Sequence, residues 1–427
     1  MNNTNTTPVI SQDIIKSITV DYKKTAIGII PKDWEVKKLG DLCFDKGEYG
    51  INAAAVDFKN DLPAYIRITD IDDDGCFSSF KKCSVDDINS SNFYLNKNDI
   101  VFVRTGATTG KAYLYNENDG KLVFAGFLIR FKIDVNKVND YFLWTYTQSK
   151  PYWDWVKTVS TRSGQPGINS TEYASIQLPI PPLPEQQKIV EIFFTWNEAI
   201  AKCNTTINSL KDRNKGLAQQ LLTGKKRLSG FSAKWEMKPL SDLLIYSPRE
   251  VDKPREPFLA LGLRSHGKGV FHKVDFEPNA IAMTKLFEVK ENDLVVNITF
   301  AWEQAIAIAS KKDEGGLVSH RFPTYTFNPK TATHSYFKFF ILQSFFKSML
   351  ELISPGGAGR NRVMSKKDFL KLEVKVPKIE EQLAIAQVLE TADQELKSYE
   401  TKLEALQLQK KGLMQQLLTG KIRVNVK

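Results

Sequence analysis

The stretch from Arg104 to Lys111, Arg-Thr-Gly-Ala-Thr-Thr-Gly-Lys, contains the residue types with which a phosphate loop binds nucleotides. Its spacing does not fit, because Gly106 and Gly110 are one residue too close and Ala112 stands where Ser or Thr should bind magnesium. We therefore interpret the stretch as a turn of small residues after a predicted strand. Its Arg, Thr and Lys groups could face DNA phosphates or base edges.

Other residue sets that could carry catalysis are missing from the sequence. We find no Asn/Asp-Pro-Pro-aromatic tetrapeptide of amino-methyltransferases, no glycine fingerprint for a cofactor and no convincing nuclease cluster. The cysteines show no paired spacing, and the histidines lie away from them in the second half of the chain. We therefore predict no metal site, no cofactor and no catalytic residue in this chain. The cysteines are Cys43, Cys76, Cys83 and Cys203, and the histidines are His266, His272, His320 and His334.

Several glycine-rich or basic segments could contact a polyanion. The segments 161–169 and 355–362 could be flexible connectors, or loops that let backbone and arginine approach a groove closely. The segments 264–269 and 319–321 are further candidates, whereas Arg67 in a predicted strand also fits a solvated face. The candidate DNA-binding residues are Arg67, Arg104, Thr105, Thr108, Thr109, Lys111, Arg162, Gln165, Asn169, Arg264, His266, Lys268, His320, Arg321, Arg360, Asn361 and Arg362.

Composition is compatible with such a partner. The 427 residues carry a formal net charge of +10, which indicates either a polyanionic partner or a solvated basic surface. No run of about 18 apolar residues predicts a membrane span, and the first residues do not resemble a signal peptide. Together with the unpaired cysteines, these features favour a reduced cytoplasm.

A long stretch of the sequence is duplicated within the chain. Residues 178–228 and 374–424 align without a gap at an offset of 196, and both include Gln-Gln-Leu-Leu-Thr-Gly-Lys. A second, shorter repeat relates the stretch that begins at Trp34 to the stretch that begins at Trp235. Such a duplication implies equivalent modules related by an approximate two-fold, and two-fold DNA is the obvious object for them to read.

Both copies of the repeat predict a long helix with a coiled-coil seam. Apolar residues step by 4 and 3, Pro-rich or Glu-rich turns precede the helices, and Gly224 and Gly420 are placed as C-terminal caps. Asn214 and Lys410 occupy equivalent polar positions that could fix the register. A helix from 185 to 222 would be about 57 Å long, long enough to serve as a ruler on DNA. The seam positions are Ile189, Phe193, Trp196, Ile200, Cys203, Ile207, Leu210, Leu217 and Leu221, and Ile385, Leu389, Ala392, Leu396, Tyr399, Leu403, Leu406, Leu413 and Leu417.

Each repeat is preceded by a block of short strands and one aromatic helix. We predict strands at 64–69, 100–103 and 122–124 in the first block, and at 258–261, 293–297 and 324–327 in the second. The aromatic helices are expected at 140–148 and 336–343. The sequence therefore predicts an α+β fold with two similar globular domains separated by two long helices that pack on each other, the two halves being related by an approximate two-fold. The expected boundaries are 1–24 for a loose extension, 25–181 for the first domain, 182–228 for the central helix, 229–377 for the second domain and 378–427 for the C-terminal helix.

The chain resembles the specificity subunit of type I restriction-modification systems. The resemblance is carried by these residues: Ile30-Pro-Lys-Asp-Trp-Glu, which opens the first block, and Gly230-Phe-Ser-Ala-Lys-Trp-Glu, which opens the second; Pro181-Pro-Leu-Pro-Glu-Gln-Gln and Lys378-Ile-Glu-Glu-Gln before the helices; and the duplicated helix ends. It covers nearly everything after the first two dozen residues. The second helix departs from the pattern, since it lacks the Pro-Pro-Leu-Pro run.

The resemblance implies a protein that is not itself an enzyme. Each block would be a target-recognition domain that reads one half of a bipartite site in double-stranded DNA. The paired helices would set the spacer and run antiparallel, which gives the pseudo-two-fold symmetry. Two modification subunits, which bind S-adenosylmethionine, and restriction subunits, which use ATP and magnesium, would be its partners. The chain itself would bind no cofactor, and its setting would be the cytoplasm of a prokaryote.

Two other hypotheses belong to different classes. A stand-alone methyltransferase–nuclease would need the missing catalytic motifs and would modify DNA unaided. A coiled-coil scaffold without a nucleic-acid role would bind DNA weakly and with little salt dependence, whereas phosphate contacts give a steep loss of affinity with salt.

Overall fold

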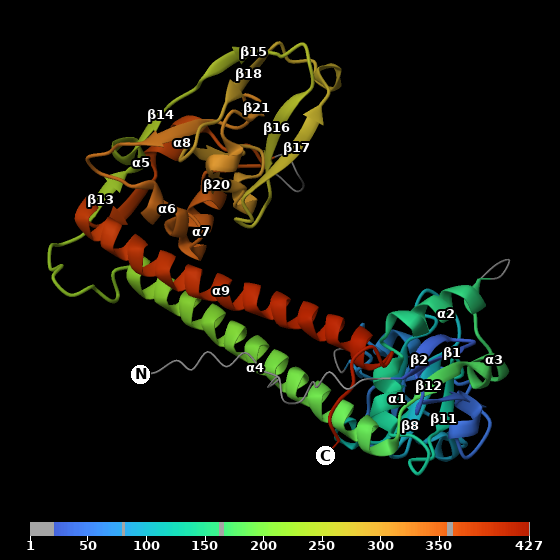
Figure 1. Ribbon diagram of the computed structural model, residues 1–427. Coiled ribbons are helices and arrows are strands. Elements are labelled where there is room, and N and C mark those ends of the chain that lie inside the picture. The colour runs from blue at the N-terminus through green and yellow to red at the C-terminus, as the bar shows by residue number, and fades with distance from the viewer. Residues whose placement is uncertain (1–20, 79–81, 162–165, 357–361, 427) are drawn as a thin grey trace. The chain divides into compact units, whose positions relative to one another are not determined.

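The computed structural model describes residues 21–78, 82–161, 166–356 and 362–426. The candidates Arg162, Gln165, Arg360 and Asn361 lie outside the described residues. The chain forms two compact units, one of residues 1–204 with 402–427 and the other of residues 205–401 (Figure 1). Each unit therefore contains a β-rich domain, one part of the helix that follows it and one part of the helix from the other repeat.

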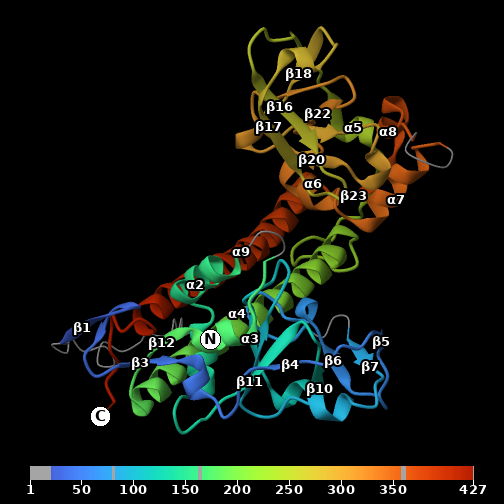
Figure 2. The same cartoon turned by 90° about the vertical axis from the view of Figure 1, so that its right-hand side faces the viewer.

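Unit 1 is built from short strands in mainly antiparallel sheets. Its strands are β1 (Tyr22–Thr25), β2 (Gly28–Pro31), β3 (Glu35–Lys38), β4 (Glu48–Tyr49), β5 (Ala55–Asp57), β6 (Ala64–Ile66), β7 (Cys83–Val85), β8 (Asp99–Val103), β9 (Ala112–Leu114), β10 (Leu122–Phe124), β11 (Leu128–Lys132) and β12 (Gln177–Ile180). One sheet has the order β4-β11-β8-β9 and another has the order β10-β6-β7-β5, in which β10 runs parallel to β6 (Figure 2). Every residue of β8 is buried, as expected for an apolar β-branched run in a central strand.

Short helices close unit 1, and one of them is the predicted aromatic helix. They are α1 (Asp140–Tyr146), α2 (Lys150–Ser160) and α3 (Ser170–Ser175). The side chain of Asn139 accepts a hydrogen bond from the backbone N–H of Phe142 and so caps α1. The face of α1 that includes Phe142 and Trp144 is buried in the domain.

Unit 2 repeats this plan with longer strands. Its elements are β13 (Glu236–Pro239), α5 (Leu240–Leu243), β14 (Leu244–Tyr246), β15 (Glu250–Asp252), β16 (Phe258–Leu263), β17 (Val270–Phe276), β18 (Lys285–Glu288), β19 (Leu294–Val296), β20 (Ile306–Ile308), β21 (Leu317–Val318), β22 (Thr324–Phe327), α6 (His334–Phe340), α7 (Ser344–Leu352), α8 (Lys366–Lys371) and β23 (Glu373–Val376). The sheet β14-β22-β19-β20 corresponds to β4-β11-β8-β9 of unit 1. The parallel pairing of β21 with β16 corresponds to that of β10 with β6.

Two expectations from the sequence need correction. The strand predicted at 64–69 ends at Ile66, because the Asp70 carboxylate accepts hydrogen bonds from the backbone and guanidinium of Arg67 and turns the chain into a 3-10 helix. The predicted loose extension reaches too far at residue 24, since Tyr22–Thr25 pairs with Gly28–Pro31 in an antiparallel hairpin, and its residues 1–20 lie outside the described residues.

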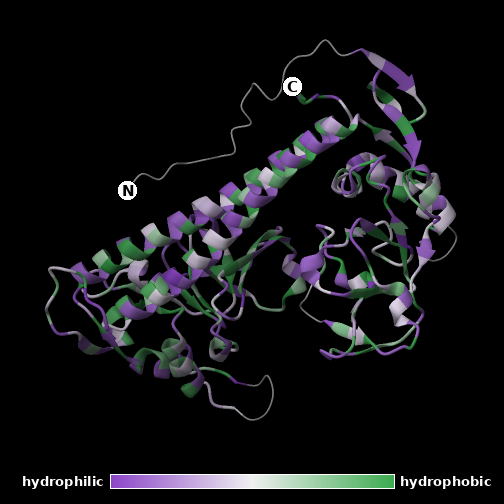
Figure 3. Ribbon diagram, turned by 90° about the horizontal axis from the view of Figure 1, so that it is seen from below, coloured by the Kyte–Doolittle hydropathy of each residue, from purple (hydrophilic) through white to green (hydrophobic). Residues whose placement is uncertain are grey.

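The long helices are α4 (Leu183–Leu222) and α9 (Ile379–Leu417), and they pack together as predicted (Figures 1 and 2). Figure 3 shows green and purple residues alternating along both helices, as a one-sided apolar seam requires. The predicted seam positions are buried or partly buried. Within unit 2, the Asn214 side-chain amide donates a 2.9 Å hydrogen bond to the carbonyl oxygen of Ala392. Lys211–Glu400 and Arg213–Glu395 ion pairs flank the seam in the same unit.

Both helices end in the same C-terminal cap. Gly224 and Gly420 have φ values of 70° and 71°, the left-handed conformation that glycine adopts without strain. The backbone N–H of Lys226 reaches the carbonyl of Gln220, and that of Ile422 reaches the carbonyl of Gln416, each at 3.2 Å. The predicted caps are therefore present at both helix ends.

Candidate nucleic-acid interface

Three loops of unit 1 meet beside the end of β8. The backbone N–H of Arg104 donates to the carbonyl of Phe127 at 3.0 Å, and the carbonyl of Arg104 accepts from Ile168 at 2.8 Å. Thr105 forms a β-bridge with Gly167 next to this point. The fold thus brings the turn after β8 together with the segment before α3, although they lie about 60 residues apart in the sequence.

Arg104 is the best-placed cation of this surface. Its guanidinium lies 4.7 Å from the ring centroid of Tyr49, and the Tyr49 hydroxyl accepts a hydrogen bond from the backbone of Ser170. Stacking restricts the arginine side chain without consuming its N–H donors. Arg104 can therefore present its donors to a phosphate or a base edge at low entropic cost.

Other candidates of unit 1 make internal contacts. The Lys111 ammonium pairs with Asp73 at 2.7 Å and donates to the carbonyl of Ile71. The buried Thr109 hydroxyl donates to the carbonyl of Gly106, and the Asn169 side chain caps α3. The remaining candidates of this unit are Thr105, whose hydroxyl donates to Pro166, the partly buried Thr108, and Arg67, whose guanidinium pairs with Asp70.

Unit 2 contains the same two backbone hydrogen bonds that Arg104 makes in unit 1, and we call this pair of bonds the backbone ladder. The side chains on the ladder differ between the units. The N–H of Ile298 donates to the carbonyl of Arg321 at 3.0 Å, and the N–H of Met364 donates to the carbonyl of Ile298 at 2.8 Å. Ile298 therefore takes the place of Arg104, and Arg321 takes the place of Phe127. In unit 2 the cation is therefore Arg321, which lies on another loop of the same surface.

The turn at 299–304 is the point where the candidates of unit 2 meet. The N–H groups of His266 and Gly267 donate to the carbonyls of Glu303 and Gln304 at 2.6 and 2.9 Å. The Arg321 guanidinium reaches the Thr299 hydroxyl at 3.4 Å, and Arg362 lies 5.2 Å from the Trp302 ring centroid. The side chains of Arg264, His266, Lys268, His320 and Arg321 are exposed.

The two units differ most in charge at one equivalent turn. In unit 1 this turn carries Asp72, Asp73 and Asp74, and Gln148 after α1 donates to the carbonyl of Asp74. In unit 2 the turn carries the exposed cations of 264–268 and packs against Leu342, which follows α6 as Gln148 follows α1. A basic turn attracts DNA phosphates, whereas an acidic turn repels them.

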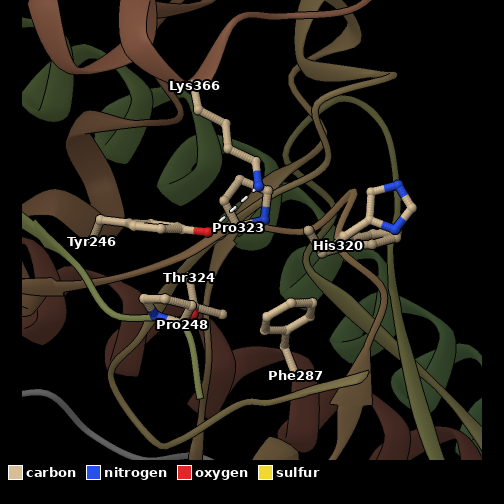
Figure 4. A pocket seen from close by; sticks show the side chains of 8 residues that line it. Tyr246, Pro248, Phe287, His320, Pro323, Thr324 and Lys366 are labelled. Carbon is tan, nitrogen blue, oxygen red and sulfur yellow. Dashed lines mark hydrogen bonds between the residues drawn. The ribbon is translucent and has the colours of Figure 1, made fainter. Parts of the chain in front are cut away.

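His320 lines a small cleft with aromatic walls. Figure 4 shows Tyr246 and Lys366 pointing toward one another above Phe287, with the ammonium group 3.5 Å from the Tyr246 hydroxyl. The Lys366 ammonium also lies 5.5 Å from the Tyr246 ring centroid. Lys366 in this cleft is therefore a second cation near the loop that carries the exposed Arg321.

The prediction from sequence missed a buried Trp–Glu–Arg cluster in each unit. In unit 1, Trp34 Nε1 donates to Glu185 at 3.0 Å, and Arg423 forms two hydrogen bonds of 2.6 and 2.7 Å with the same carboxylate. In unit 2, Trp235 and Arg227 make the corresponding contacts with Glu381. The sequence held a signal for this cluster, because its Trp, Glu and Arg residues stand at matching positions of the duplicated stretches.

The electrostatics of the first cluster follow from its geometry. Hydrogen bonding to Glu185 raises the pKa of Arg423, although burial opposes this effect. The hydrogen bond from Arg423 lowers the pKa of Asp33 below its usual value. Each charge of the cluster is therefore stabilised by a direct partner, which joins the end of α9 to the start of α4.

In the part of the chain that the structure describes, no group of His, Cys, Asp and Glu side chains could hold a metal ion. Within the same residues, no helix is long and apolar enough to cross a membrane.

Each unit holds a β-rich domain joined to parts of two long helices, and each domain presents arginines from its loops. This arrangement suits a protein that recognises DNA. A family model described as the type I restriction modification DNA specificity domain matches residues 31–212 and, again, residues 232–408. The chain belongs to this family. It is the DNA specificity subunit of a type I restriction-modification system, a non-catalytic recognition subunit.

Similar proteins span nearly the whole chain. The type I restriction enzyme MjaVIII specificity subunit of Methanocaldococcus jannaschii is 23% identical over 92% of this chain and 94% of its own length. The HsdS subunit from Thermoanaerobacter tengcongensis has a TM-score of 0.50 and 14% identity over 92% of this chain and 98% of its own. A chain from a structure of complex assembly and conformational transition in a type I system has a TM-score of 0.53 and 13% identity over 92% of this chain and 99% of its own. The two structural likenesses concern the fold alone.

Proposed function

We propose that the domains at 25–181 and 229–377 each read one half of a bipartite DNA site, and that the helix segments at 182–228 and 378–427 set the distance between the halves. The observation that carries this proposal is the duplicated Trp–Glu–Arg cluster. In each unit it fixes one domain to the N-terminal end of one long helix and to the C-terminal end of the other. A rigid helix pair of this kind transmits its length to the spacing of what the domains bind.

The domains read unequal half-sites in this proposal. Unit 1 presents Arg104 from the turn after β8, whereas unit 2 presents Arg321 and the basic turn 264–268 from other loops. Recognition of bases depends on the direction from which a donor enters a groove. The same backbone ladder with displaced cations therefore supports an asymmetric target.

Catalysis belongs to other subunits in this proposal. Two modification subunits, which would use S-adenosylmethionine, would dock on this chain and methylate adenine in double-stranded DNA. Restriction subunits, which would use ATP and magnesium, would join that core. The setting that we propose is the cytoplasm of a prokaryotic cell.

An insertion in the helices tests the proposal. Seven residues, one heptad, inserted after Asn208 in α4 and after Thr401 in α9 preserve the seam and lengthen the pair by about 10 Å. Mapping of methylated adenine in host DNA should then give the same half-sites separated by about three more base pairs, at roughly 3.4 Å each.

A matched control places the same seven residues after Glu256, in the exposed loop between β15 and β16 that is outside both helices, and should leave the spacer unchanged. Retention of the original spacer by the helix variant, with methylation intact, would show that the helices do not set the distance. Loss of the motif in the loop control would show that the chain tolerates no insertion at all.

A further inference from the structure

The hairpin β16–β17 of unit 2 lines an open cavity of about 410 Å³. This volume lies within the range of roughly 300–1,000 Å³ that is usual for small-molecule sites. The rings of Phe258, Phe271 and Phe276 come from the hairpin, and those of Phe300 and Phe322 come from the loops that carry the candidate DNA contacts. Aromatic walls of this kind offer flat apolar surfaces to a planar ligand.

A side-chain amide faces the same cavity. The Asn297 oxygen accepts a hydrogen bond from the backbone of Thr299 at 3.0 Å, and within the described residues its nitrogen donates to no protein group. In unit 1 the equivalent ladder position is Val103, which is fully buried. The amide is therefore particular to unit 2, and it offers a donor to the polar edge of a ligand.

Cations border these rings. The Arg264 guanidinium lies 5.5 Å from the Phe271 ring centroid, and the Lys273 ammonium lies 5.9 Å from Phe271 and 5.4 Å from Phe276. The exposed Arg321 stands in sequence between two residues that line the cavity. Positive charge beside aromatic rings matches a ligand that combines a planar base with phosphates.

We propose that this cavity holds one nucleobase swung out of the DNA duplex, with Phe271 as its stacking surface, Asn297 as donor to its polar edge, and Arg264, Lys273 and Arg321 on the adjoining phosphates. The proposal rests on the proposed function, because it requires the second domain to sit on DNA. Swinging a base out of the duplex costs stacking and pairing energy, which stacking on Phe271 and the hydrogen bond from Asn297 offset. Nothing equivalent is proposed for unit 1.

Fluorescence of 2-aminopurine tests the proposal once methylation mapping has given the target. The base analogue is placed in turn at each position of the half-site bound by unit 2, and the purified full chain is added without modification subunits. A base that leaves the stack becomes several-fold brighter, and we expect this at one position. Because the modification subunits are absent, the signal cannot come from their methylation sites.

Matched variants assign the signal to the cavity. Phe271→Leu keeps an apolar side chain and removes the stacking surface, and Asn297→Asp keeps the acceptor for Thr299 while removing the amide donor. Both should abolish the brightening and weaken binding to the duplex about tenfold. Phe345→Leu, a partly buried phenylalanine of unit 2 that does not line the cavity, should behave as the wild type.

Distinct results overturn the two proposals. If the duplex binds and footprinting places unit 2 on its half-site, but 2-aminopurine stays dark at every position, the base does not enter the cavity. Brightening that survives Phe271→Leu and Asn297→Asp also overturns this assignment. Self-association of the chain that is lost in Phe271→Leu would identify a second copy as the occupant instead. A chain that binds no specific duplex at all contradicts the proposed function itself.

Discussion

The two Trp–Glu–Arg clusters have the same chemistry but differ in how the chain reaches them. In unit 2, Arg227 and Trp235 are eight residues apart, and both contact Glu381. In unit 1, Arg423 comes from 238 residues beyond Glu185 and also pairs with Asp33 at 2.8 and 2.9 Å. The position equivalent to Asp33 is Lys234, and Arg227 instead donates to the backbone carbonyl of Ala233. The long-range cluster therefore has an extra carboxylate where the local one has none.

The difference reflects the chain entropy that is lost when each cluster forms. A short loop between Arg227 and Trp235 limits the entropy lost when they meet, whereas Arg423 must be brought from a distant part of the sequence. The second ion pair with Asp33 compensates by adding charge-assisted hydrogen bonds. Duplicated residues can thus keep their roles while one added side chain adjusts stability.

The largest expected effect comes from removing the shared carboxylate. Glu381→Ala should lower the free energy of unfolding of unit 2 by about 3–5 kcal/mol, because it leaves Arg227 and the Trp235 N–H without their charged partner. Glu185→Ala should cost unit 1 less, since Asp33 still pairs with Arg423. Hydrogen exchange, read separately for the helix ends of each unit, measures both losses.

The exposed Glu191, whose ion pair is with Lys188, supplies the control, and Glu191→Ala should leave exchange unchanged. A greater loss from Glu185→Ala than from Glu381→Ala would show that Asp33 does not support the first cluster.

A smaller effect is expected at the equivalent polar positions of the helix pair. Burial lowers the pKa of Lys410 below its usual 10.5, although the nearby Asp74 opposes this. Lys410→Leu should therefore stabilise unit 1 by about 1 kcal/mol at pH 7, as expected for a polar seam residue. Asn214→Leu should change unit 2 less, because it gives up the hydrogen bond to Ala392.

The pH dependence distinguishes the two positions. The penalty for a charged Lys410 is fully present below its folded-state pKa and vanishes as pH rises toward 10.5, where the unfolded chain also loses its proton. The advantage of Lys410→Leu should shrink between pH 7 and pH 10 in denaturant titrations, and that of Asn214→Leu should not. A constant advantage at both positions would contradict the proposed cost of burying the ammonium group.

The smallest effect belongs to Asp33. Its pKa is lowered by Arg423, so its contribution to stability is present above the usual value of 3.8 and is lost as pH falls through the lower, folded-state value. Asp33→Asn should cost unit 1 less than about 1 kcal/mol at pH 7, because the side chain is 53% exposed and solvent screens the pair. Acid titration of unfolding should show the wild type and variant converging below the folded-state pKa.

The reciprocal variant Lys234→Asp should add the missing ion pair to Arg227 and stabilise unit 2. No gain there would show that the backbone geometry at 233–234, rather than charge, separates the clusters.

The helices were predictable because their information is periodic. Apolar residues at heptad spacing fixed the buried seam, and the repeated Thr-Gly-Lys marked both left-handed glycine caps. The strands were predictable where apolar runs are unbroken, as in β8 and β10. The strand at 64–69 was predicted too long because the hydrogen bonds between Arg67 and Asp70 have no periodic signature.

The candidate interface was less predictable because it depends on which loops meet. The sequence made Lys111 a candidate for contact with DNA, whereas in the structure Asp73 from another loop pairs with it. Arg104 and Ile298 take the same ladder position, but only the backbone hydrogen bonds identify them as equivalent. Glu185 stands in the first turn of α4, where an acidic side chain favours the helix dipole, but its principal partners are Trp34 and Arg423.

The distance of Arg423 from Glu185 also imposes an order of events on the ribosome. At roughly 5–20 residues per second, the arginine is made about 12–48 s after the glutamate that it must bind. The domain translated first therefore waits for residues 402–423 before its contacts with the end of α9 can form. Until then the seam positions at the start of α4 lack the part of α9 on which they pack, and a translating cell must keep them from aggregating.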